Sequence, residues 1–387
     1  MLFDNYNKFI NFKLKEIFNK NQFRQLKVTK RRKKSYVENG NKKLLSFACN
    51  DYLSLSTDTR LIKEATKAAE KYGTGSGASR LITGNNPLYK KLEKELSIMK
   101  KTEACIVFGS GFLANIGVIS ALANKNDLIL IDNLSHSSSF LGTKLTKAKV
   151  IKFKHNNMSD LEKKLISYRK KYEKCMILTE GVFSMDGDIA PQEKITSLKK
   201  KYNAFFVLDD AHGIGVLGDG TGSSSLFHGK SEVDICIGTL SKSIGSYGGF
   251  VCGKKNLIDF LINRCRTQIY TTGLPPSVLA ASIKAIKIII NSPKLIKKPL
   301  ENATYFSNLF GLKNPKSSII PVILNNESRV INACKYLENK GILVGGIRPP
   351  TVPKNTSRLR IAFNSSHTKR NIEDLANNLK NFLKYDN

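Results

Sequence analysis

The sequence predicts an α/β protein with a mainly parallel sheet in a large domain and a smaller α+β domain at the C-terminus. Short apolar runs alternate with amphipathic stretches through the middle of the chain, which is the first indication. Glycine-rich polar turns follow several of these runs, and the pattern changes after about residue 290. A chain of 387 residues with 41% hydrophobic content can bury both cores.

Seven apolar runs are the candidate strands of the large domain. Amphipathic stretches, such as 158–172 and 192–202, separate most of them. Continuous apolar strands that alternate with helices are typical of a mainly parallel sheet covered on both faces. Ligands bind such sheets beyond the carboxyl ends of the strands. The runs are Ala104–Phe108, Leu128–Ile131, Val150–Phe153, Cys175–Thr179, Ala204–Leu208, Ile235–Thr239 and Gly249–Gly253.

The two ends of the chain differ from this middle region. We expect an N-terminal helix and extended segment over 1–50, a large domain over 51–290 and a small domain over 291–387. Residues 1–18 have helical periodicity, and we interpret them as an amphipathic helix that packs on the protein or on a partner subunit. The last expected helix of the large domain ends near 290; the small domain should contain strands at 318–324, 342–344 and 358–362 and helices at 328–339 and 369–383.

The formal net charge of +32 raises the question of a polyanionic partner such as nucleic acid. The lysines are scattered along helical stretches, however, and the one dense run, Lys30–Lys34, has no interleaved aromatic side chains to stack on bases. We therefore expect solvated basic helix faces and no nucleic-acid partner.

Cysteine usage and hydropathy bear on location. None of the seven cysteines forms a C-x-x-C pair, and most lie in apolar runs, as expected for buried reduced thiols in a cytoplasmic protein. No apolar stretch is long enough to span a bilayer, so no membrane association is expected. The N-terminal stretch contains Asp4 and Glu16 and lacks the apolar core of a signal peptide.

The strongest local pattern is Thr239-Leu-Ser-Lys242, with glycines at 245, 248 and 249. An apolar strand delivers the lysine into a tight polar turn, and the small residues around it allow a bulky group to approach the backbone. A lysine in this setting can form a Schiff base with an aldehyde cofactor. Without further evidence, a lysine after a strand is usually a surface residue.

A second pattern comes directly after the expected strand 204–208. There Asp209, Asp210 and His212 lie within four residues of one another. A carboxylate below a pyridine nitrogen raises the pKa of that nitrogen and keeps it protonated, which creates an electron sink. His212 could hold a phenolic oxygen of the same cofactor. The same residue types could also bind a metal ion, but no second cluster nearby completes a coordination shell.

Two further patterns follow the first two expected strands of the large domain. The segment Phe108-Gly-Ser-Gly-Phe112 precedes a helix that starts near Ala114, and backbone N–H groups at such a start suit a phosphate. A nucleotide P-loop is excluded, because its G-x-x-x-x-G-K-[ST] pattern is absent. His136 follows another strand and could stack on an aromatic cofactor ring, although a lone histidine is normally structural.

Taken together, the motifs resemble those of the α-oxoamine synthases, which are pyridoxal-phosphate enzymes of the aspartate-aminotransferase fold, fold type I. They occur in the family's order, and the resemblance covers about residues 47–367. The sequence departs from the family at Cys49, where serine is usual, and at Asn157, where aspartate is usual. The motifs are Gly73-Thr-Gly-Ser-Gly77, Ser135-His136, Thr179-Glu-Gly-Val-Phe-Ser-Met-Asp-Gly187, Asp209-Asp-Ala-His-Gly213 and Thr239-Leu-Ser-Lys242.

The resemblance implies a role for each residue toward pyridoxal phosphate. Lys242 would form the Schiff base and exchange the proton at the substrate's α-carbon. Asp209 would face the pyridine nitrogen and His212 the phenolic oxygen. His136 would stack on the ring, with Ser184 nearby. The other cofactor contacts that it implies are Ser110, Gly111, Phe112, Thr239 and Ser241.

The resemblance also implies substrate contacts. Asn50 and Arg360 would bind the substrate carboxylate, and the planar fork of an arginine suits this because it can bind both oxygens. Arg24 and Thr351 fall where the family contacts substrate, and His136 would contact it as well.

Two segments bear on partner and substrates. Thr271 and Thr272 match a segment that reaches the partner subunit's cofactor phosphate, which implies a homodimer with shared sites. The run Gly346-Ile-Arg-Pro-Pro-Thr-Val-Pro353 is typical of members that join L-alanine to a pimeloyl thioester, on coenzyme A or acyl carrier protein, with loss of carbon dioxide. A complete set of catalytic residues argues against a non-catalytic subunit. The alternatives are relatives that use glycine with acetyl- or succinyl-coenzyme A, or serine with a long acyl chain.

Overall fold

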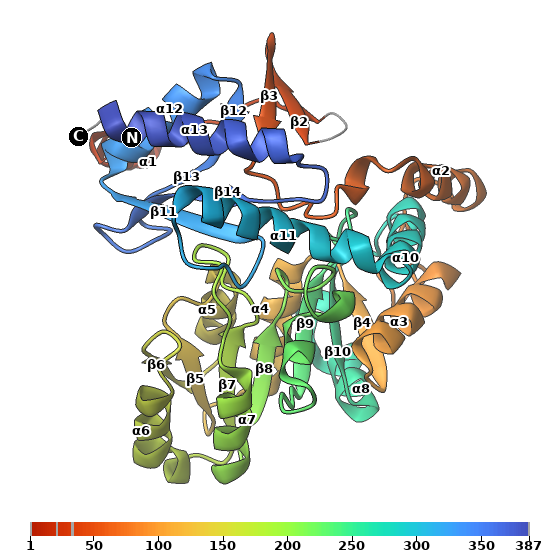
Figure 1. Ribbon diagram of the computed structural model, residues 1–387. Helices are drawn as coiled ribbons and strands as arrows, with labels where there is room; N and C mark the ends of the chain where they lie inside the picture. Colours follow the sequence, from red (N-terminus) through yellow and green to blue (C-terminus); the bar gives the residue numbers. More distant parts are fainter. Residues whose placement is uncertain (1, 21, 32–34, 386–387) are drawn as a thin grey trace.

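The computed structural model describes residues 2–20, 22–31 and 35–385. Its centre is a seven-stranded sheet with strand order β4-β10-β9-β8-β7-β5-β6 (Figure 1). Neighbouring strands are parallel except for β10, which is antiparallel to both β4 and β9. The predicted α/β fold with a mainly parallel seven-stranded sheet is confirmed. The strands are β4 Ala104–Phe108, β5 Leu128–Asp132, β6 Lys149–Phe153, β7 Cys175–Glu180, β8 Phe205–Asp209, β9 Ile235–Thr239 and β10 Gly249–Gly253.

Helices cover both faces of this sheet, because successive strand residues point to opposite sides. On one face Ile129 and Ile131 pack with α4 and α8, and on the other Leu128 and Leu130 pack with α6 and α7. The helices of this part are α2 Thr59–Tyr72, α3 Pro87–Lys100, α4 Gly111–Leu122, α5 Ser137–Lys144, α6 Met158–Tyr168, α7 Gln192–Lys201, α8 Lys255–Arg264, α9 Arg266–Ile269 and α10 Pro276–Ile290, with 3-10 turns η1 Leu55–Thr57, η2 Arg169–Lys171, η3 Gly218–Gly220 and η4 Ser223–Phe227.

The C-terminal elements surround a second core that also includes Leu45 and Phe47 from the N-terminal region. A three-stranded sheet has the order β11-β14-β13, and a four-stranded sheet, β1-β2-β3-β12, joins strands from both ends of the chain. The C-terminal elements are α11 Pro293–Phe310, β11 Ile319–Asn325, α12 Glu327–Asn339, β12 Ile342–Leu343, β13 Gly345–Ile347, β14 Ser357–Ala362 and α13 Lys369–Tyr385. The N-terminal strands are β1 Lys30–Arg31, β2 Tyr36–Asn39 and β3 Lys42–Ser46.

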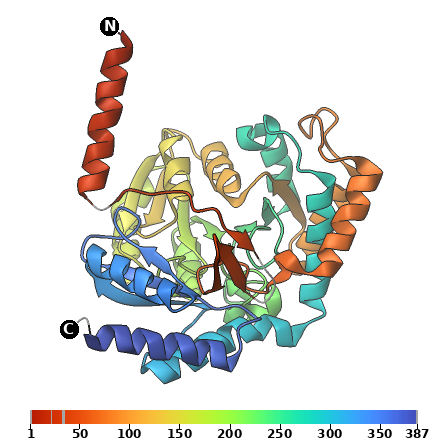
Figure 2. The same cartoon turned by 90° about the horizontal axis from the view of Figure 1, so that it is seen from above.

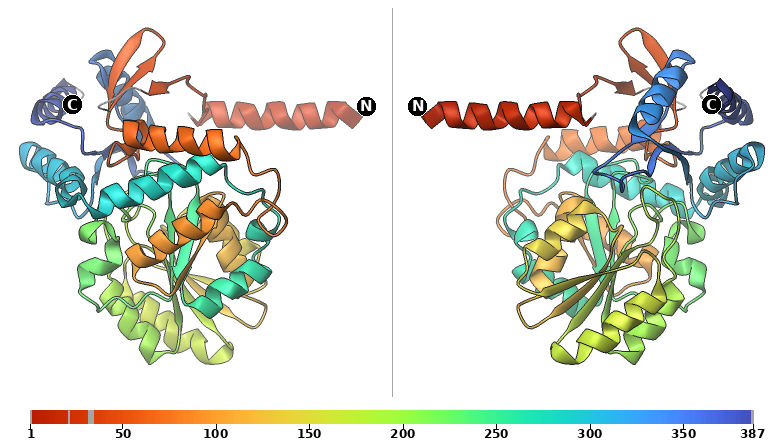
Figure 3. Two further views of the ribbon diagram at one scale, coloured as in Figure 1. Left: turned by 90° about the vertical axis from the view of Figure 1, so that its right-hand side faces the viewer. Right: turned by 90° about the vertical axis from the view of Figure 1, so that its left-hand side faces the viewer.

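The N-terminal helix, α1 Leu2–Asn19, extends away from the body of the molecule (Figures 2 and 3). The expectation that it packs on its own chain is therefore wrong. No apolar surface among the described residues of the chain covers its apolar face, and Tyr6, Phe9 and Phe18 are exposed. Packing on a partner subunit stays a prediction.

The basic run 30–34 falls only partly in the described structure, because residues 32–34 lie outside it. Lys30 and Arg31 form β1 and are exposed. None of the helices in the described parts of the chain combines the length and apolar character that crossing a bilayer requires.

Candidate active site

A cavity of about 240 Å³ lies at the carboxyl edge of the large sheet. The strands β7, β8 and β9 end there at Glu180, Asp209 and Thr239. The cavity brings together most of the predicted cofactor residues, which lie far apart in the sequence. Its lining consists of Ser110, Gly111, Phe112, Asn115, His136, Ser138, Glu180, Asp209, Ala211, His212, Thr239, Ser241 and Lys242.

Lys242 follows β9, and its Nζ lies 2.8 Å from Nε2 of His212. Burial lowers the pKa of Lys242 to about 8, although the carboxylates of Asp209 and Glu180 oppose this change. Burial, together with the charges of Lys242 and Arg360, holds the pKa of His212 well below its usual range. At neutral pH the imidazole is therefore uncharged, and the lysine amine can readily gain or lose a proton.

Asp209 ends β8 with its carboxylate facing the cavity. Its Oδ2 accepts a hydrogen bond from Nδ2 of Asn115 at 2.7 Å, and its Oδ1 accepts one from the backbone N–H of Ala211 at 3.0 Å. Asp210, the next residue, is fully buried and lies 3.5 Å from the amine of Lys100 instead. Across the described residues, no group of three or more His, Cys, Asp and Glu side chains is placed to hold a metal ion.

His136 immediately precedes α5 and serves as its N-cap. Its Nδ1 accepts a hydrogen bond from the backbone N–H of Ser138 at 3.2 Å and lies 2.7 Å from that residue's hydroxyl. Phe112 approaches the imidazole edge-on, with ring centroids 6.5 Å apart. Burial lowers the pKa of His136, so this ring is also neutral at physiological pH. A neutral, fixed imidazole suits stacking on a cofactor ring.

The start of α4, which lines the cavity, has the features of an anion site. Ser110 caps the twelve-residue helix α4, with its Oγ accepting from the backbone N–H of Leu113 at 3.1 Å. Thr239 and Ser241 line the same cavity, and the backbone N–H of Ser241 donates to Oγ1 of Thr239 at 3.1 Å. A helix N-terminus with adjacent hydroxyls suits a phosphate, because free N–H groups and the helix dipole both favour negative charge.

Arg360, on β14, joins the C-terminal part of the chain to this edge. Its Nε donates to the backbone oxygen of Ser184, and one terminal nitrogen lies 3.2 Å from the hydroxyl of Tyr52. That hydroxyl is also 3.3 Å from Oδ1 of Asn50 and 2.6 Å from Nδ1 of His212. The predicted carboxylate-binding residues Asn50 and Arg360 are therefore linked to the cavity through Tyr52.

Comparison with known proteins gives the family. The family model for class I and II aminotransferases matches residues 42–379. An 8-amino-7-oxononanoate synthase from Beijerinckia indica subsp. indica is 46% identical over 334 residues, 86% of each chain. One from Maricaulis maris is 42% identical over 371 residues, which cover 96% of this chain and 95% of the relative. The chain belongs to the 8-amino-7-oxononanoate synthase family.

Solved structures agree with this assignment. A structure of 8-amino-7-oxononanoate synthase from Francisella tularensis is 29% identical, with a TM-score of 0.76 over 89% of this chain and 98% of the other. A serine palmitoyltransferase variant from S. paucimobilis, with a bound PLP–myriocin aldimine, is 26% identical, with a TM-score of 0.91 over 100% of this chain and 99% of the other. The protein is thus an acyltransferase of a pyridoxal-phosphate-dependent family, and its cofactor is pyridoxal phosphate.

The residues of the cavity fit the cofactor of this family. Lys242 offers an amine for its aldehyde, Asp209 a carboxylate for its ring nitrogen, and the start of α4 an anion site for its phosphate. A Cβ at Gly111 would lie 3.4 Å from Cβ of Thr239, an ordinary van der Waals contact, so the protein's own packing does not require glycine there.

Seven predicted site residues lie outside the cavity lining: Asn50, Ser184 and Arg360, described above, and Arg24, Thr271, Thr272 and Thr351. Arg24 and Thr351 meet each other, with a terminal nitrogen of the arginine 3.3 Å from the threonine Oγ1. Thr271 donates its hydroxyl hydrogen to the backbone oxygen of Thr267 at 2.6 Å, and Thr272 is exposed. The family's role for Thr271 and Thr272 toward a partner subunit stays a prediction.

Sequence reasoning missed several residues of the 8-amino-7-oxononanoate synthase site. Asn115 donates a hydrogen bond to Asp209, and the backbone N–H of Ser138 donates one to His136. Tyr52 connects Asn50 with His212. Glu180 also lines the cavity, where burial and then the charge of Asp209 raise the pKa of its carboxyl well above the usual range. Its signals in the sequence were its place at the end of an apolar run and within the motif 179–187.

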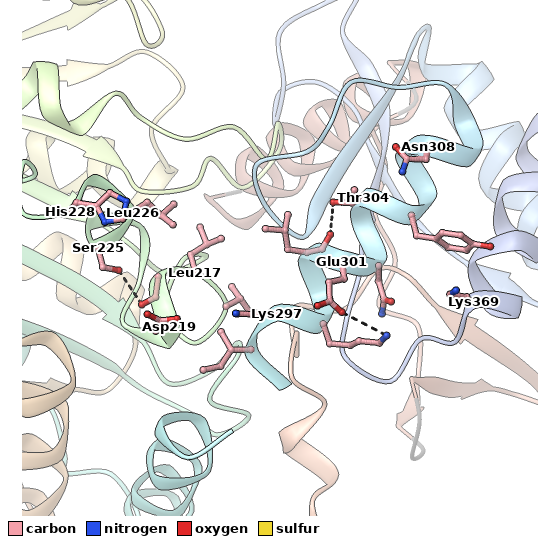
Figure 4. A pocket seen from close by; sticks show the side chains of 17 residues that line it. Leu217, Asp219, Ser225, Leu226, His228, Lys297, Glu301, Thr304, Asn308 and Lys369 are labelled. Carbon is pink, nitrogen blue, oxygen red and sulfur yellow. Dashed lines mark hydrogen bonds and ion pairs between the residues drawn. The ribbon is translucent and has the colours of Figure 1, made fainter. Parts of the chain in front are cut away.

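A larger cavity, of about 890 Å³, lies between the segment 216–228 and α11 (Figure 4). Its rim includes Asp219, Lys297 and Lys369. None of the predicted site residues lines it, so its size does not make it the active site.

Proposed function

We propose that this protein condenses L-alanine with a pimeloyl thioester, carried on coenzyme A or acyl carrier protein. The products are 8-amino-7-oxononanoate, carbon dioxide and the free thiol, and the reaction belongs to biotin biosynthesis. The observation that carries the proposal is the convergence of Lys242, Asp209 and His212 on one cavity in a chain of this family. The alanine and pimeloyl specificity rests on the relatives' names and on the 346–353 run.

The cavity residues divide the work of holding the cofactor. Ser110, Gly111, Thr239 and Ser241 would bind its phosphate, with Phe112 beside them. When bound, pyridoxal phosphate supplies the electron sink that stabilises negative charge on the α-carbon of the amino acid.

The charged groups of the site control that electron sink. Asp209 would keep the ring nitrogen protonated, because an adjacent negative charge favours the protonated form. Asn115 and the backbone of Ala211 hold this carboxylate in a single orientation. His212 would hold the phenolic oxygen and His136 the ring face, with Ser184 nearby.

Lys242 is the proposed base that removes the α-proton and later returns it. A pKa of about 8 leaves part of the amine neutral at pH 7, as a base requires, while most of it remains able to donate. Arg360 and Asn50 would bind the alanine carboxylate and thereby orient the α-hydrogen. Holding two substrates at one site supplies much of the rate, since it removes the entropy cost of their encounter.

The remaining proposals concern assembly and location. Thr271 and Thr272 would reach the partner's cofactor phosphate in a homodimer, and Arg24 and Thr351 would contact substrate from one chain. We also propose a cytoplasmic enzyme, in line with seven cysteines that are all free.

A substrate panel tests the function. Alanine, glycine and serine are each combined with pimeloyl-, acetyl-, succinyl- and palmitoyl-coenzyme A, and products are identified by mass spectrometry. We expect alanine with the pimeloyl thioester to give a kcat/KM at least roughly tenfold above any other pair, a difference of about 1.4 kcal/mol in transition-state binding. A preference for glycine or serine would contradict the proposal.

A second candidate is another α-oxoamine synthase, with serine and a long acyl chain. It is favoured by the serine palmitoyltransferase structure, which matches all of this chain with the TM-score of 0.91. The lower identity of 26% to that structure places it second.

A further inference from the structure

The hydroxyl of Tyr52 lies between the predicted carboxylate-binding residues and His212. It is 2.6 Å from Nδ1 of His212, 3.3 Å from Oδ1 of Asn50 and 3.2 Å from a terminal nitrogen of Arg360. The tyrosine side chain is fully buried, so these protein groups determine where its hydrogen points.

The donor and acceptor types of these neighbours leave one arrangement. The guanidinium of Arg360 can only donate, so the Tyr52 hydroxyl accepts from it. Oδ1 of Asn50 can only accept, so Tyr52 donates its single hydrogen there. Nδ1 of His212 must then carry a hydrogen of its own and donate to the hydroxyl oxygen.

This arrangement assigns the tautomer of His212. Burial keeps the ring neutral, so a hydrogen on Nδ1 leaves Nε2 as an acceptor. Nε2 lies 2.8 Å from Nζ of Lys242, which is largely an ammonium at neutral pH and donates to it. Each hydrogen bond from Lys242 to Asn50 then joins one donor to one acceptor.

We propose that Tyr52 is a positioning residue that couples the carboxylate site to the tautomer of His212. A carboxylate accepts hydrogen bonds from Arg360 and from Nδ2 of Asn50, and turning the Asn50 amide to donate takes its Oδ1 away from the Tyr52 hydroxyl. The hydroxyl hydrogen then turns to Nδ1 of His212, and the ring carries its hydrogen on Nε2. The ring gains one hydrogen and loses one by exchange with water, so its charge stays zero. Lys242 releases one proton to water, so that its neutral amine accepts from Nε2–H.

The new tautomer presents an Nε2–H donor toward the cavity, as the proposed contact with a phenolic oxygen requires. This consequence rests on the proposed function, whereas the coupling itself needs only a carboxylate. The charged and titratable groups facing His212 are Lys242 after β9, Arg360 on β14, His136 before α5 and Tyr52 before η1. Because Lys242 faces Nε2 and its pKa is about 8, a rise in pH through 8 also favours the Nε2–H tautomer, so signals with and without propanoate are compared at one fixed pH.

Nitrogen NMR of the ligand-free protein tests the coupling directly. The chain has five histidines, so ¹⁵N-histidine labelling resolves each ring, and His212→Gln assigns the signals. We expect Nδ1–H in the wild type and a shift toward Nε2–H at saturating propanoate, which is alanine without its amine. In Tyr52→Phe the signals of His212 should not respond, while calorimetry still detects propanoate binding.

Tyr202→Phe is the matched control. Its hydroxyl donates to Oε1 of Glu162 at 3.1 Å, beyond the opposite end of β8, and the variant should respond to propanoate like the wild type. A tautomer that propanoate leaves unchanged in the wild type overturns the proposal, as does a full response in Tyr52→Phe. The wild-type measurement needs no variant, so it decides even if the Tyr52 substitution prevents folding.

Kinetics of the holoenzyme separates this proposal from the proposed function. Tyr52→Phe should lower kcat roughly tenfold and leave KM for alanine within about twofold, because it removes orientation of a catalytic group without removing carboxylate contacts. A wild-type kcat in this variant overturns the coupling. If the wild type itself does not turn over alanine and pimeloyl thioester, the proposed function fails, and the NMR result still decides the role of Tyr52.

Discussion

Lys242 shows how burial changes the chemistry of a single residue. In water its amine would be almost fully protonated at neutral pH, whereas in the cavity its pKa is about 8. Lys242→Ala should lower turnover by about 10³-fold or more and abolish the covalent attachment of pyridoxal phosphate. Borohydride reduction followed by peptide mass spectrometry measures the attachment.

The control for this variant is Lys199→Ala, since that amine pairs with Asp234 at 2.7 Å, away from the cavity. It should keep both attachment and turnover. Recovery of the cofactor on a lysine other than Lys242 in the wild type would refute the assignment.

The proposed role of Asp209 depends on its negative charge more than on the shape of its side chain. Asp209→Asn keeps an oxygen for Asn115 and should fold, but it cannot keep a pyridine nitrogen protonated. We expect α-proton exchange of L-alanine in deuterated water to slow by roughly 100-fold. Proton NMR measures this exchange. Asp234→Asn is the control, and exchange at the wild-type rate in Asp209→Asn would count against the role.

At the scale of elements, His155 clamps three segments together. Its Nδ1 lies 3.0 Å from Asp132, at the end of β5, and its Nε2 lies 2.8 Å from Asp188, beyond β7. Burial alone would lower the pKa of His155, but the hydrogen bonds and charges of the two carboxylates outweigh it and raise the pKa to about 10. The clamp is thus charged throughout the physiological range.

A raised pKa in the folded state fixes the sign of the pH dependence. Protonation stabilises the fold fully below the reference pKa of 6.5, and this contribution is lost as the pH rises toward 10. The Tm of the wild type should exceed that of His155→Gln at pH 6, and the gap should close by about pH 10. His228→Gln removes an exposed histidine as a control, and a gap for His155→Gln that is independent of pH would contradict the clamp.

The buried pair Lys100–Asp210 ties the end of α3 to the turn after β8. The lysine also donates to the backbone oxygen of Thr221, and Oδ2 of the aspartate accepts from the backbone N–H of Ser223 at 2.9 Å. Lys100→Met should destabilise the protein by about 3 kcal/mol, because it leaves a buried carboxylate without its cation. Urea unfolding measures this, and Lys100→Met with Asp210→Asn should recover most of the loss. Additive losses would show that the two side chains are not coupled.

For the molecule as a whole, the sequence predicted the large sheet well because buried strands are continuous apolar runs. Each of the seven expected strands has both ends within one residue of an observed strand. The helix α11 was missed, since Pro299 inside it argues against a helix. Strands β2 and β3 were missed because their exposed faces are polar and because β12, the partner of β3, lies about 300 residues away. The expected boundary between the large and small domains near residue 290 stays a prediction.

Site residues that belong to one motif at the end of a strand could be predicted from the sequence. Residues that contact each other from distant parts of the sequence could not. Asp209 and His212 share one motif, whereas the bond between Asn115 and Asp209 joins residues 94 positions apart. Tyr52 and Arg360 are separated by 308 positions, and no local pattern signals their contact.

The exposed helix α1 leads to a prediction about assembly. If it packs on a partner subunit, deletion of residues 1–19 should weaken self-association at least roughly tenfold, because burying even two of its aromatic side chains contributes about 3–6 kcal/mol. Sedimentation equilibrium measures this, and circular dichroism controls for the fold of the remaining chain. An unchanged association constant would mean that the helix serves something other than the dimer.

The late place of β10 in the sequence has a consequence for biosynthesis. In the described sheet β4 has β10 as its only neighbour, and more than a hundred residues separate the two. A nascent chain that has left the ribosome only as far as residue 248 therefore has β4 unpaired, and the start of α4 lacks the backbone of Gly249 against which it packs. Cofactor capture during translation must wait for that last central strand, and premature termination before it leaves an exposed edge open to aggregation.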